Sequence, residues 1–178
     1  MVGLLGAAAL VLLAAGAPKI LRPGLGGAAL TAARLPWARH LRPTWVVRLT
    51  GLAEVAVALS VIAFGGRPAA AAVLVTFVVL AAFARRMMTV APGQGCGCFG
   101  QAVSPVGPWH VGTNLALAAV GAAATLSPPP SLAVALGSQP WAGVPLLALT
   151  ALLAYLTYLL MTALPSMLDA AAGRAVAR

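Results

Sequence analysis

The stretch from Met87 to Leu168 contains no lysine, arginine, aspartate or glutamate. A soluble domain has charged residues at about 25% of its positions, whereas only 7% of this 178-residue chain is charged and 62% is hydrophobic. A chain of this size has no core large enough to bury so long an apolar stretch. The apolar runs are too long for barrel strands and lack strict alternation, so the sequence predicts an all-α integral membrane protein.

Five apolar runs are expected to form membrane-spanning helices. They cover about residues 2–17, 44–64, 69–84, 109–126 and 141–164. Pro165 is expected to end the last run, and a short basic tail follows at 166–178. We interpret residues 1–165 as one transmembrane helical domain. The basic connection at 18–43 is either a short interfacial helix or a plain loop.

The net charge of +9 follows a membrane pattern. Ten of the eleven cations fall in or beside the first connection, at Arg85-Arg86 or near the C-terminus, and only Arg67 falls on the opposite side. Because cytoplasmic loops carry an excess of lysine and arginine, the basic end is predicted to face the cytoplasm of a bacterium, with the chain multi-pass in its inner membrane. The expected partner is the lipid bilayer and not nucleic acid, because no basic stripe with interleaved aromatic residues appears.

Both cysteines lie in one turn-rich segment, Cys96-Gly97-Cys98-Phe99-Gly100. Two thiols two residues apart close a disulfide only with strain, and a strained disulfide is easily exchanged. We therefore predict that Cys96 and Cys98 are catalytic in thiol–disulfide exchange with a thiol-containing partner protein, as in a membrane thiol–disulfide oxidoreductase. The segment falls on the basic side, whereas disulfide formation suits the outside of the cell, so the side that it faces stays open.

Two alternatives to exchange also stay open. In the first, the chain is a non-catalytic membrane assembly or transport factor, and the cysteine segment only shapes a loop. In the second, it handles a metal with Cys96, Cys98, His40 and His110, although their spacing matches no recognised zinc motif. We therefore assign no metal ligands.

Three further polar residues are predicted to form a pocket beneath the cysteine segment. Glu54 is the only acidic residue inside an apolar run, and such a carboxyl is costly in a membrane and marks a functional site by default. It is expected to pair with a polar group on the 109–126 helix or to accept protons from a bound quinone. His110 and Asn114 share one helical face at i and i+4, and His110 is a candidate proton relay. The alternative is that Glu54 and Asn114 only form packing hydrogen bonds and that His110 lies at headgroup level.

The cysteine segment, followed by a polar linker, Trp109-His110 and then Asn114 at the start of an apolar helix, resembles the MauE family of methylamine-utilisation membrane proteins. Lys19 at the end of the first run and Gly51-Leu52-Ala53-Glu54, which matches the family's Gly-x-x-Glu segment, add to the resemblance. Thr113 is a departure, because the family commonly has arginine there.

The resemblance has implications for fold and function. The family is related to the DoxX-like group, which implies a four-helix bundle, here with a fifth C-terminal transmembrane helix. It also implies a redox-associated role in maturing a disulfide-rich partner subunit. The cofactor stays unknown, and a quinone is one candidate electron acceptor.

Overall fold

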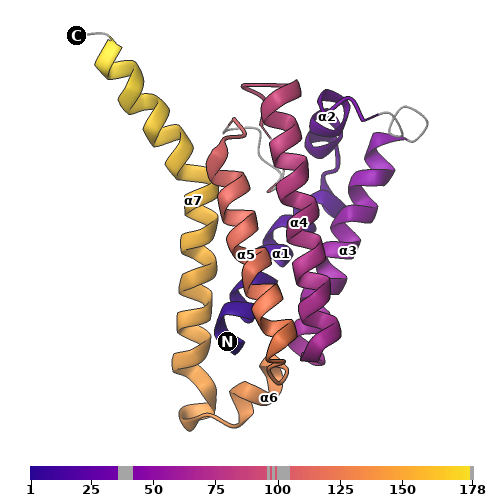
Figure 1. Ribbon diagram of the computed structural model, residues 1–178, viewed down its shortest axis with the longest axis vertical. Coiled ribbons are helices and arrows are strands. Elements are labelled where there is room, and N and C mark those ends of the chain that lie inside the picture. The colour runs from indigo at the N-terminus through magenta and orange to yellow at the C-terminus, as the bar shows by residue number, and fades with distance from the viewer. Residues whose placement is uncertain (36–41, 96, 98, 100–104, 177–178) are drawn as a thin grey trace.

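The computed structural model describes residues 1–35, 42–95, 97, 99 and 105–176, and these residues are mostly helical (Figure 1). The long helices are α1 (Val2–Leu21), α3 (Pro43–Ala63), α4 (Gly66–Val90), α5 (Pro108–Leu126) and α7 (Val144–Val176). The short ones are α2 (Gly24–Ala32), α6 (Leu132–Gly137) and the 3-10 helix η2 (Pro140–Gly143). Within the described ranges the β-structure is a single isolated bridge. The all-α prediction is confirmed.

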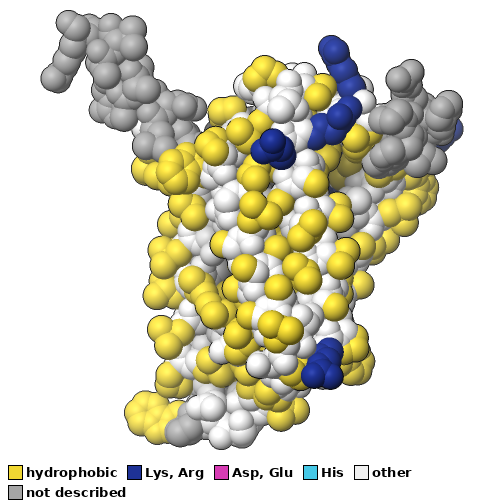
Figure 2. All heavy atoms as spheres, in the orientation of Figure 1, with side chains coloured by type: hydrophobic (Ala, Val, Ile, Leu, Met, Phe, Trp, Pro, Cys, Tyr) yellow, Lys and Arg dark blue, Asp and Glu magenta, His cyan; other side chains and the backbone are white. Residues whose placement is uncertain are grey.

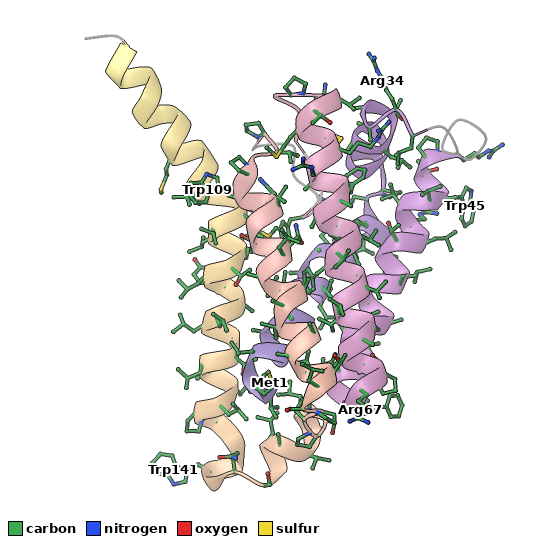
Figure 3. The ribbon with its side chains drawn as sticks, viewed as in Figure 1. Met1, Arg34, Trp45, Arg67, Trp109 and Trp141 are labelled. Atoms are coloured by element: carbon green, nitrogen blue, oxygen red, sulfur yellow. The ribbon has the colours of Figure 1, made fainter. Side chains whose placement is uncertain are left out.

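The long helices run alternately in opposite directions through the bundle. Figure 1 shows α2, the α4–α5 connection and the end of α7 at one end, with α6 and the α3–α4 turn at the other. Arg34 and Arg67 are labelled at these opposite ends in Figure 3. The two basic connections and the basic tail therefore share one end, as the order of the apolar runs predicts. Which end faces the cytoplasm stays a prediction.

Four helices in the described part of the chain are long and apolar enough to cross a membrane: α1, α3, α4 and the Val144–Leu164 part of α7. The face of the bundle shown in Figure 2 carries hydrophobic side chains over most of its length, and its lysine and arginine side chains lie towards the two ends. A fifth span is not confirmed, because α5 does not belong to this set. Its first two turns carry His110, Thr113 and Asn114, which lower its apolar character. The integral membrane fold itself is confirmed.

Several helices extend beyond the predicted runs. α1 continues through Pro18 and Lys19, and α4 continues past Arg85-Arg86. The expectation that Pro165 ends the last helix is wrong, because α7 reaches Val176. A proline removes one backbone donor, so a helix can continue through it where the neighbouring turns stay intact.

Glycines bring two pairs of long helices into close contact. A Cβ atom added to Gly16 of α1 would lie 2.7 Å from the Gly51 carbonyl oxygen of α3. A Cβ atom added to Gly121 of α5 would lie 2.6 Å from the Leu74 backbone nitrogen of α4. Small residues allow membrane helices to approach this closely. The α1–α3 contact also determines the geometry of the site described next.

Candidate functional site

The base of the cysteine-containing connection is closed by backbone pairing. The Val106 N–H donates to the Gln94 carbonyl at 3.0 Å, and Gly95 forms an antiparallel bridge with Pro105. Cys96 and Cys98 lie outside the described residues, but Gly97 between them is described. Gly97 is buried and has a φ of +63°, a left-handed conformation that glycine adopts at little cost. The chain between the two cysteines is therefore held inside the bundle.

Phe99 fixes the same segment against α7. Its side chain is half-buried and packs against the main apolar core. Its ring meets the Tyr158 ring edge-to-face, with centroids 5.1 Å apart and an interplanar angle of 83°. Aromatic pairs favour this arrangement. Gly97 and Phe99 thus both face the interior.

Lys19 and Glu54 form a buried ion pair between α1 and α3. The Lys19 ammonium donates to Glu54 Oε1, and the two residues are 8% and 2% exposed. Glu54 Oε2 is buried and has no hydrogen-bond partner among the described residues. The sequence-based expectation that Glu54 pairs with a polar group on residues 109–126 is therefore wrong. The partner is Lys19, because α1 and not α5 crosses α3 at this level.

The glycine contact explains why these two charges meet. Lys19 follows Gly16 by three residues, and Glu54 follows Gly51 by three residues. Because α1 and α3 run in opposite directions, Glu54 lies across from Gly16 and Lys19 lies across from Gly51, with their Cβ atoms 3.2 Å and 2.9 Å from the Cβ positions of those glycines. Each glycine therefore leaves space for the charged side chain of the facing helix. Sequence reasoning missed this role for Lys19, because a lysine at the end of an apolar run usually extends to the headgroups. The matching spacing of Gly16-x-x-Lys19 and Gly51-x-x-Glu54 was the available signal.

A cavity of about 160 Å³ joins the ion pair to the cysteine segment. Lys19, Glu54 and Gly97 all line it. Its other walls are mainly apolar and come from α2, α3 and α4, including Leu30, Val47 and Phe83. We call it the ion-pair cavity. It brings a buried carboxylate and ammonium to the residue that separates the two cysteines.

His110 and Asn114 are buried beside this region, and both are hydrogen-bonded locally. The His110 Nδ1 accepts the Gly107 N–H at 3.2 Å, and the ring lies within hydrogen-bonding reach of the Met161 backbone carbonyl. The Asn114 Nδ2 donates to the His110 carbonyl at 2.6 Å. Asn114 also lines a small cavity of about 10 Å³ together with Lys19, a space the size of a single water site. Asn114 therefore adjoins the ion pair, whereas His110 caps the start of α5 and faces α7.

Comparison with known proteins identifies the family of this chain. Residues 2–127 match the family described as methylamine utilisation protein MauE. The chain belongs to the MauE family. Comparisons with curated proteins and with solved structures find no significant match. The resemblance read from the cysteine segment is thus confirmed at the family level, while the relation to the DoxX-like group stays a prediction.

The matched region contains the whole ion-pair cavity. Lys19, Glu54 and Gly97 fall within residues 2–127, and so do all the helices that line the cavity. The helix α7, with Tyr158 and Met161, lies beyond the match. The MauE-family part of this chain therefore holds the ion pair, and α7 packs against it as an addition.

Arg86 holds α2 over the cavity. Its Nε donates to the Ala33 carbonyl at 2.8 Å, and its other guanidinium nitrogen donates to the Arg34 carbonyl at 3.0 Å. These carbonyls lie at the C-terminal end of α2, where a cation is favoured. Arg86, which the sequence analysis places at the basic end of the membrane domain, therefore links α4 to α2, the helix that covers the ion-pair cavity.

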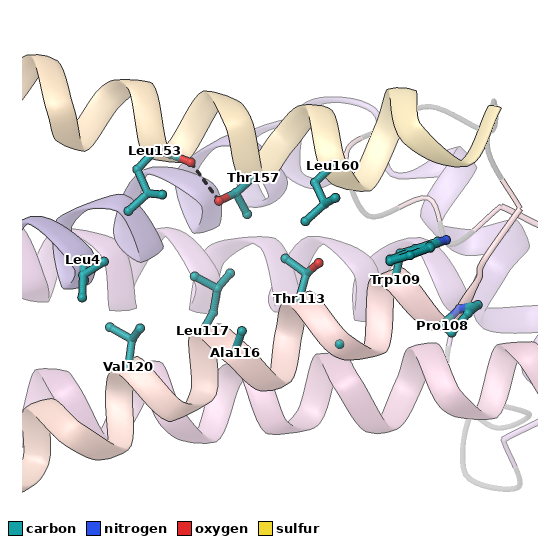
Figure 4. A pocket seen from close by; sticks show the side chains of 11 residues that line it. Leu4, Pro108, Trp109, Thr113, Ala116, Leu117, Val120, Leu153, Thr157 and Leu160 are labelled. Carbon is teal, nitrogen blue, oxygen red and sulfur yellow. Dashed lines mark hydrogen bonds between the residues drawn. The ribbon is translucent and has the colours of Figure 1, made fainter. Parts of the chain in front are cut away.

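A second and larger hollow lies between α5 and α7 (Figure 4). This α5–α7 groove has a volume of about 650 Å³, and Trp109, Thr113, Leu117, Leu153 and Thr157 are among its lining residues. The Thr157 hydroxyl donates to the Leu153 carbonyl of its own helix at 2.8 Å. No ionisable side chain of the described residues lines the groove. Its mainly apolar lining is typical of a surface that faces lipid.

Proposed function

We propose that this MauE-family membrane protein assists the maturation of a thiol-containing partner protein by thiol–disulfide exchange at Cys96 and Cys98. Family membership supports a context of methylamine utilisation or a related thiol pathway. The observation that carries the proposal is that Gly97, which separates the two cysteines, lines the same cavity as the buried Lys19–Glu54 pair. Four helices that are long and apolar enough to cross a membrane support a reaction at the bilayer.

The ion pair supplies what a cysteine thiol of the reduced protein needs when the Cys96–Cys98 disulfide is formed again. The thiolate is the nucleophile, and a nearby cation favours it. Glu54 Oε2, which is buried and unpartnered among the described groups, accepts the thiol proton. Lys19 then pairs with the thiolate in place of the carboxylate. The net charge of the cluster does not change, so no additional charge is created in the apolar interior, where an unpaired charge is very costly.

Exchange with the partner starts from the Cys96–Cys98 disulfide and proceeds through a mixed disulfide. A partner thiolate attacks one sulfur of the Cys96–Cys98 disulfide, which forms a bond to the partner and releases the other cysteine as a thiolate. A second partner thiolate attacks the mixed disulfide and leaves with a new disulfide. Both cysteines end as thiols, and their protons come from the two partner thiols. The strain of a ring closed across one residue favours this direction.

Single serine variants test the proposal. We expect Cys96→Ser and Cys98→Ser each to leave the partner's thiols unoxidised, because neither variant can form the Cys96–Cys98 disulfide that the partner thiolate attacks. Thr89→Ser is the matched control, because Thr89 is exposed near the C-terminal end of α4, which precedes the cysteine segment. The readout is the partner's redox state on non-reducing gels after thiol alkylation. Normal oxidation of the partner by both cysteine variants would overturn exchange.

The same alkylation chemistry reports which side the cysteines face. A membrane-impermeant maleimide is applied to intact cells with and without prior reduction, since these are the only two cysteines. Labelling only after reduction supports a disulfide outside the cytoplasm and overturns the orientation from the charge rule. Labelling only after lysis, without a reductant, means free cytoplasmic thiols and contradicts the oxidising role.

One observation favours a second candidate, a non-catalytic assembly factor. Phe99 packs against the core and against Tyr158, so the cysteine segment also has a structural role in joining α7 to the bundle. Under this alternative, Phe99→Ala lowers maturation of the partner while both serine variants support it. Exchange predicts the reverse order of severity.

A further inference from the structure

We infer that the ion-pair cavity binds the ring of a membrane quinone, which removes the electrons that Cys96 and Cys98 take from the partner. The inference rests on the proposed exchange reaction, since each catalytic cycle leaves a dithiol that must be reoxidised. It concerns a different event, however, because ligand binding in the cavity is measurable without any thiol.

The size and walls of the cavity fit a single apolar ring. A cavity of about 150 Å³ lined by apolar side chains holds a benzene molecule, and this cavity has a volume of about 160 Å³. Leu30, Val47 and Phe83 supply apolar walls. There is room for one ring but not for a long chain, so an attached tail must leave the cavity.

The rim of the cavity offers that exit. Thr50 of α3 and Val79 of α4 both line the cavity and are both exposed, with Val79 at 59%. They belong to two membrane-spanning helices, so their exposed sides face lipid. A ligand therefore enters between α3 and α4 from the bilayer, and its tail stays there. This route requires a lipid-soluble ligand.

The polar end of the cavity specifies what the ring must carry. Glu54 Oε2 is a buried acceptor that lacks a donor among the described residues, and a buried unsatisfied group is costly. The hydroxyl of a hydroquinone donates to such an oxygen, and the carbonyl of a quinone accepts from the Lys19 ammonium. A plain acyl chain satisfies neither group. Both redox forms of a quinone thus find a partner in the Lys19–Glu54 pair.

The redox step balances with the quinone as oxidant. The two S–H bonds of Cys96 and Cys98 break and one S–S bond forms. Two electrons pass to the quinone ring. Two protons pass to its two oxygens, one of them by way of Glu54, and hydroquinone results. The hydroquinone leaves through the α3–α4 opening and is reoxidised elsewhere in the membrane.

Binding of a decyl-tailed benzoquinone to the purified protein in lipid nanodiscs tests the inference by calorimetry. We expect saturable binding to the wild type and to the Cys96→Ser/Cys98→Ser double variant. Val79→Trp fills the rim and is expected to weaken binding at least tenfold. Val78→Trp is the matched control, because Val78 is 45% exposed on the same helix and does not line the cavity. Equal binding by both tryptophan variants, or equal binding of decanol and the quinone, would overturn the site.

Quinone reduction separates the two proposals. With the pre-reduced wild type, the ultraviolet absorbance of the quinone should fall by one equivalent per cysteine pair, and the double serine variant should leave it unchanged. If the wild type binds no quinone but oxidises its partner when given a soluble disulfide, the inference is overturned and the exchange function stands. If quinone binds but the thiols never reduce it, the cavity is a ligand site and the electron route is wrong.

Discussion

The α1–α3 and α4–α5 contacts are built alike but carry different residues. In both, a glycine removes the Cβ atom that would clash with the facing backbone, at 2.7 Å for Gly16 and 2.6 Å for Gly121. Around Gly121 the facing residues are Ala70 and Leu74, and the contact is apolar. In the α1–α3 contact Gly16 faces Glu54 and Gly51 faces Lys19, and these two side chains form an ion pair. Both glycine contacts therefore bring two helices close together, and the side chains that face the glycines determine whether the contact is apolar or charged.

This difference has an energetic consequence. An apolar membrane contact is stabilised by van der Waals packing, whereas a buried ion pair must offset the desolvation of both charges. Replacing Lys19 and Glu54 together by hydrophobic residues of similar size would cost little or no stability. The proposed function of the ion-pair cavity is our explanation for a charged pair at this position.

The largest expected effect comes from breaking the pair on one side. Lys19→Met leaves Glu54 buried without its cation and should lower the free energy of unfolding by about 3–5 kcal/mol. The double variant Lys19→Met/Glu54→Leu should recover most of that loss. The measurement is reversible unfolding in mixed micelles, with Arg67→Met as the exposed control. A double variant as unstable as the single one would contradict an energetic coupling of the two charges.

A smaller effect is expected from adding one methyl group at each crossing. Gly51→Ala and Gly121→Ala both force a Cβ atom against a helix backbone, and each should destabilise the protein by about 1–3 kcal/mol. Only Gly51→Ala also moves Lys19, whose Cβ would lie 2.9 Å from the new atom. The alkylation rate of the cysteines should change in Gly51→Ala and stay at the wild-type value in Gly121→Ala. Equal changes in both would mean that the two contacts do not differ in function.

The smallest effect is expected in the α5–α7 groove. Thr113→Val keeps the shape of a half-buried residue in the larger hollow. It should change the free energy of unfolding by less than about 0.5 kcal/mol and leave partner oxidation and quinone binding unchanged. A loss of either activity would move the site from the ion-pair cavity to the groove.

The helical membrane fold could be predicted from the sequence, but the ion-pair partner of Glu54 could not. Apolar runs separated by basic or glycine- and proline-rich turns determine helices in a bilayer, because backbone groups must be satisfied within each segment. Helix ends were less predictable, and α7 passes through Pro165 because one missing donor does not end a helix. The ion pair depends on which helices cross, and that information lies in the three-dimensional packing of Gly16 against Gly51.

The three predicted pocket residues lie in different surroundings, because their positions also depend on which helices pack together. Glu54 lines the cavity beside Gly97, and Asn114 adjoins Lys19 through a smaller cavity. His110 turns its ring to the Gly107 backbone and towards α7. The helical spacing of His110 and Asn114 fixed their shared face, but not which neighbouring helix that face would meet. The roles of these residues, and of Cys96 and Cys98, stay predictions.

The most direct test of the account is the pH dependence of cysteine alkylation by a small permeant maleimide, after reduction, in wild-type, Lys19→Met and Glu54→Gln proteins. Because a cation favours the thiolate and an anion disfavours it, Lys19→Met should raise the apparent thiol pKa and Glu54→Gln should lower it. Arg85→Gln removes an exposed cation near the C-terminal end of α4, and it should leave the apparent thiol pKa unchanged. Opposite shifts in the two pair variants are the predicted result. Profiles that coincide with the wild type in both would contradict any coupling between the ion pair and the thiols.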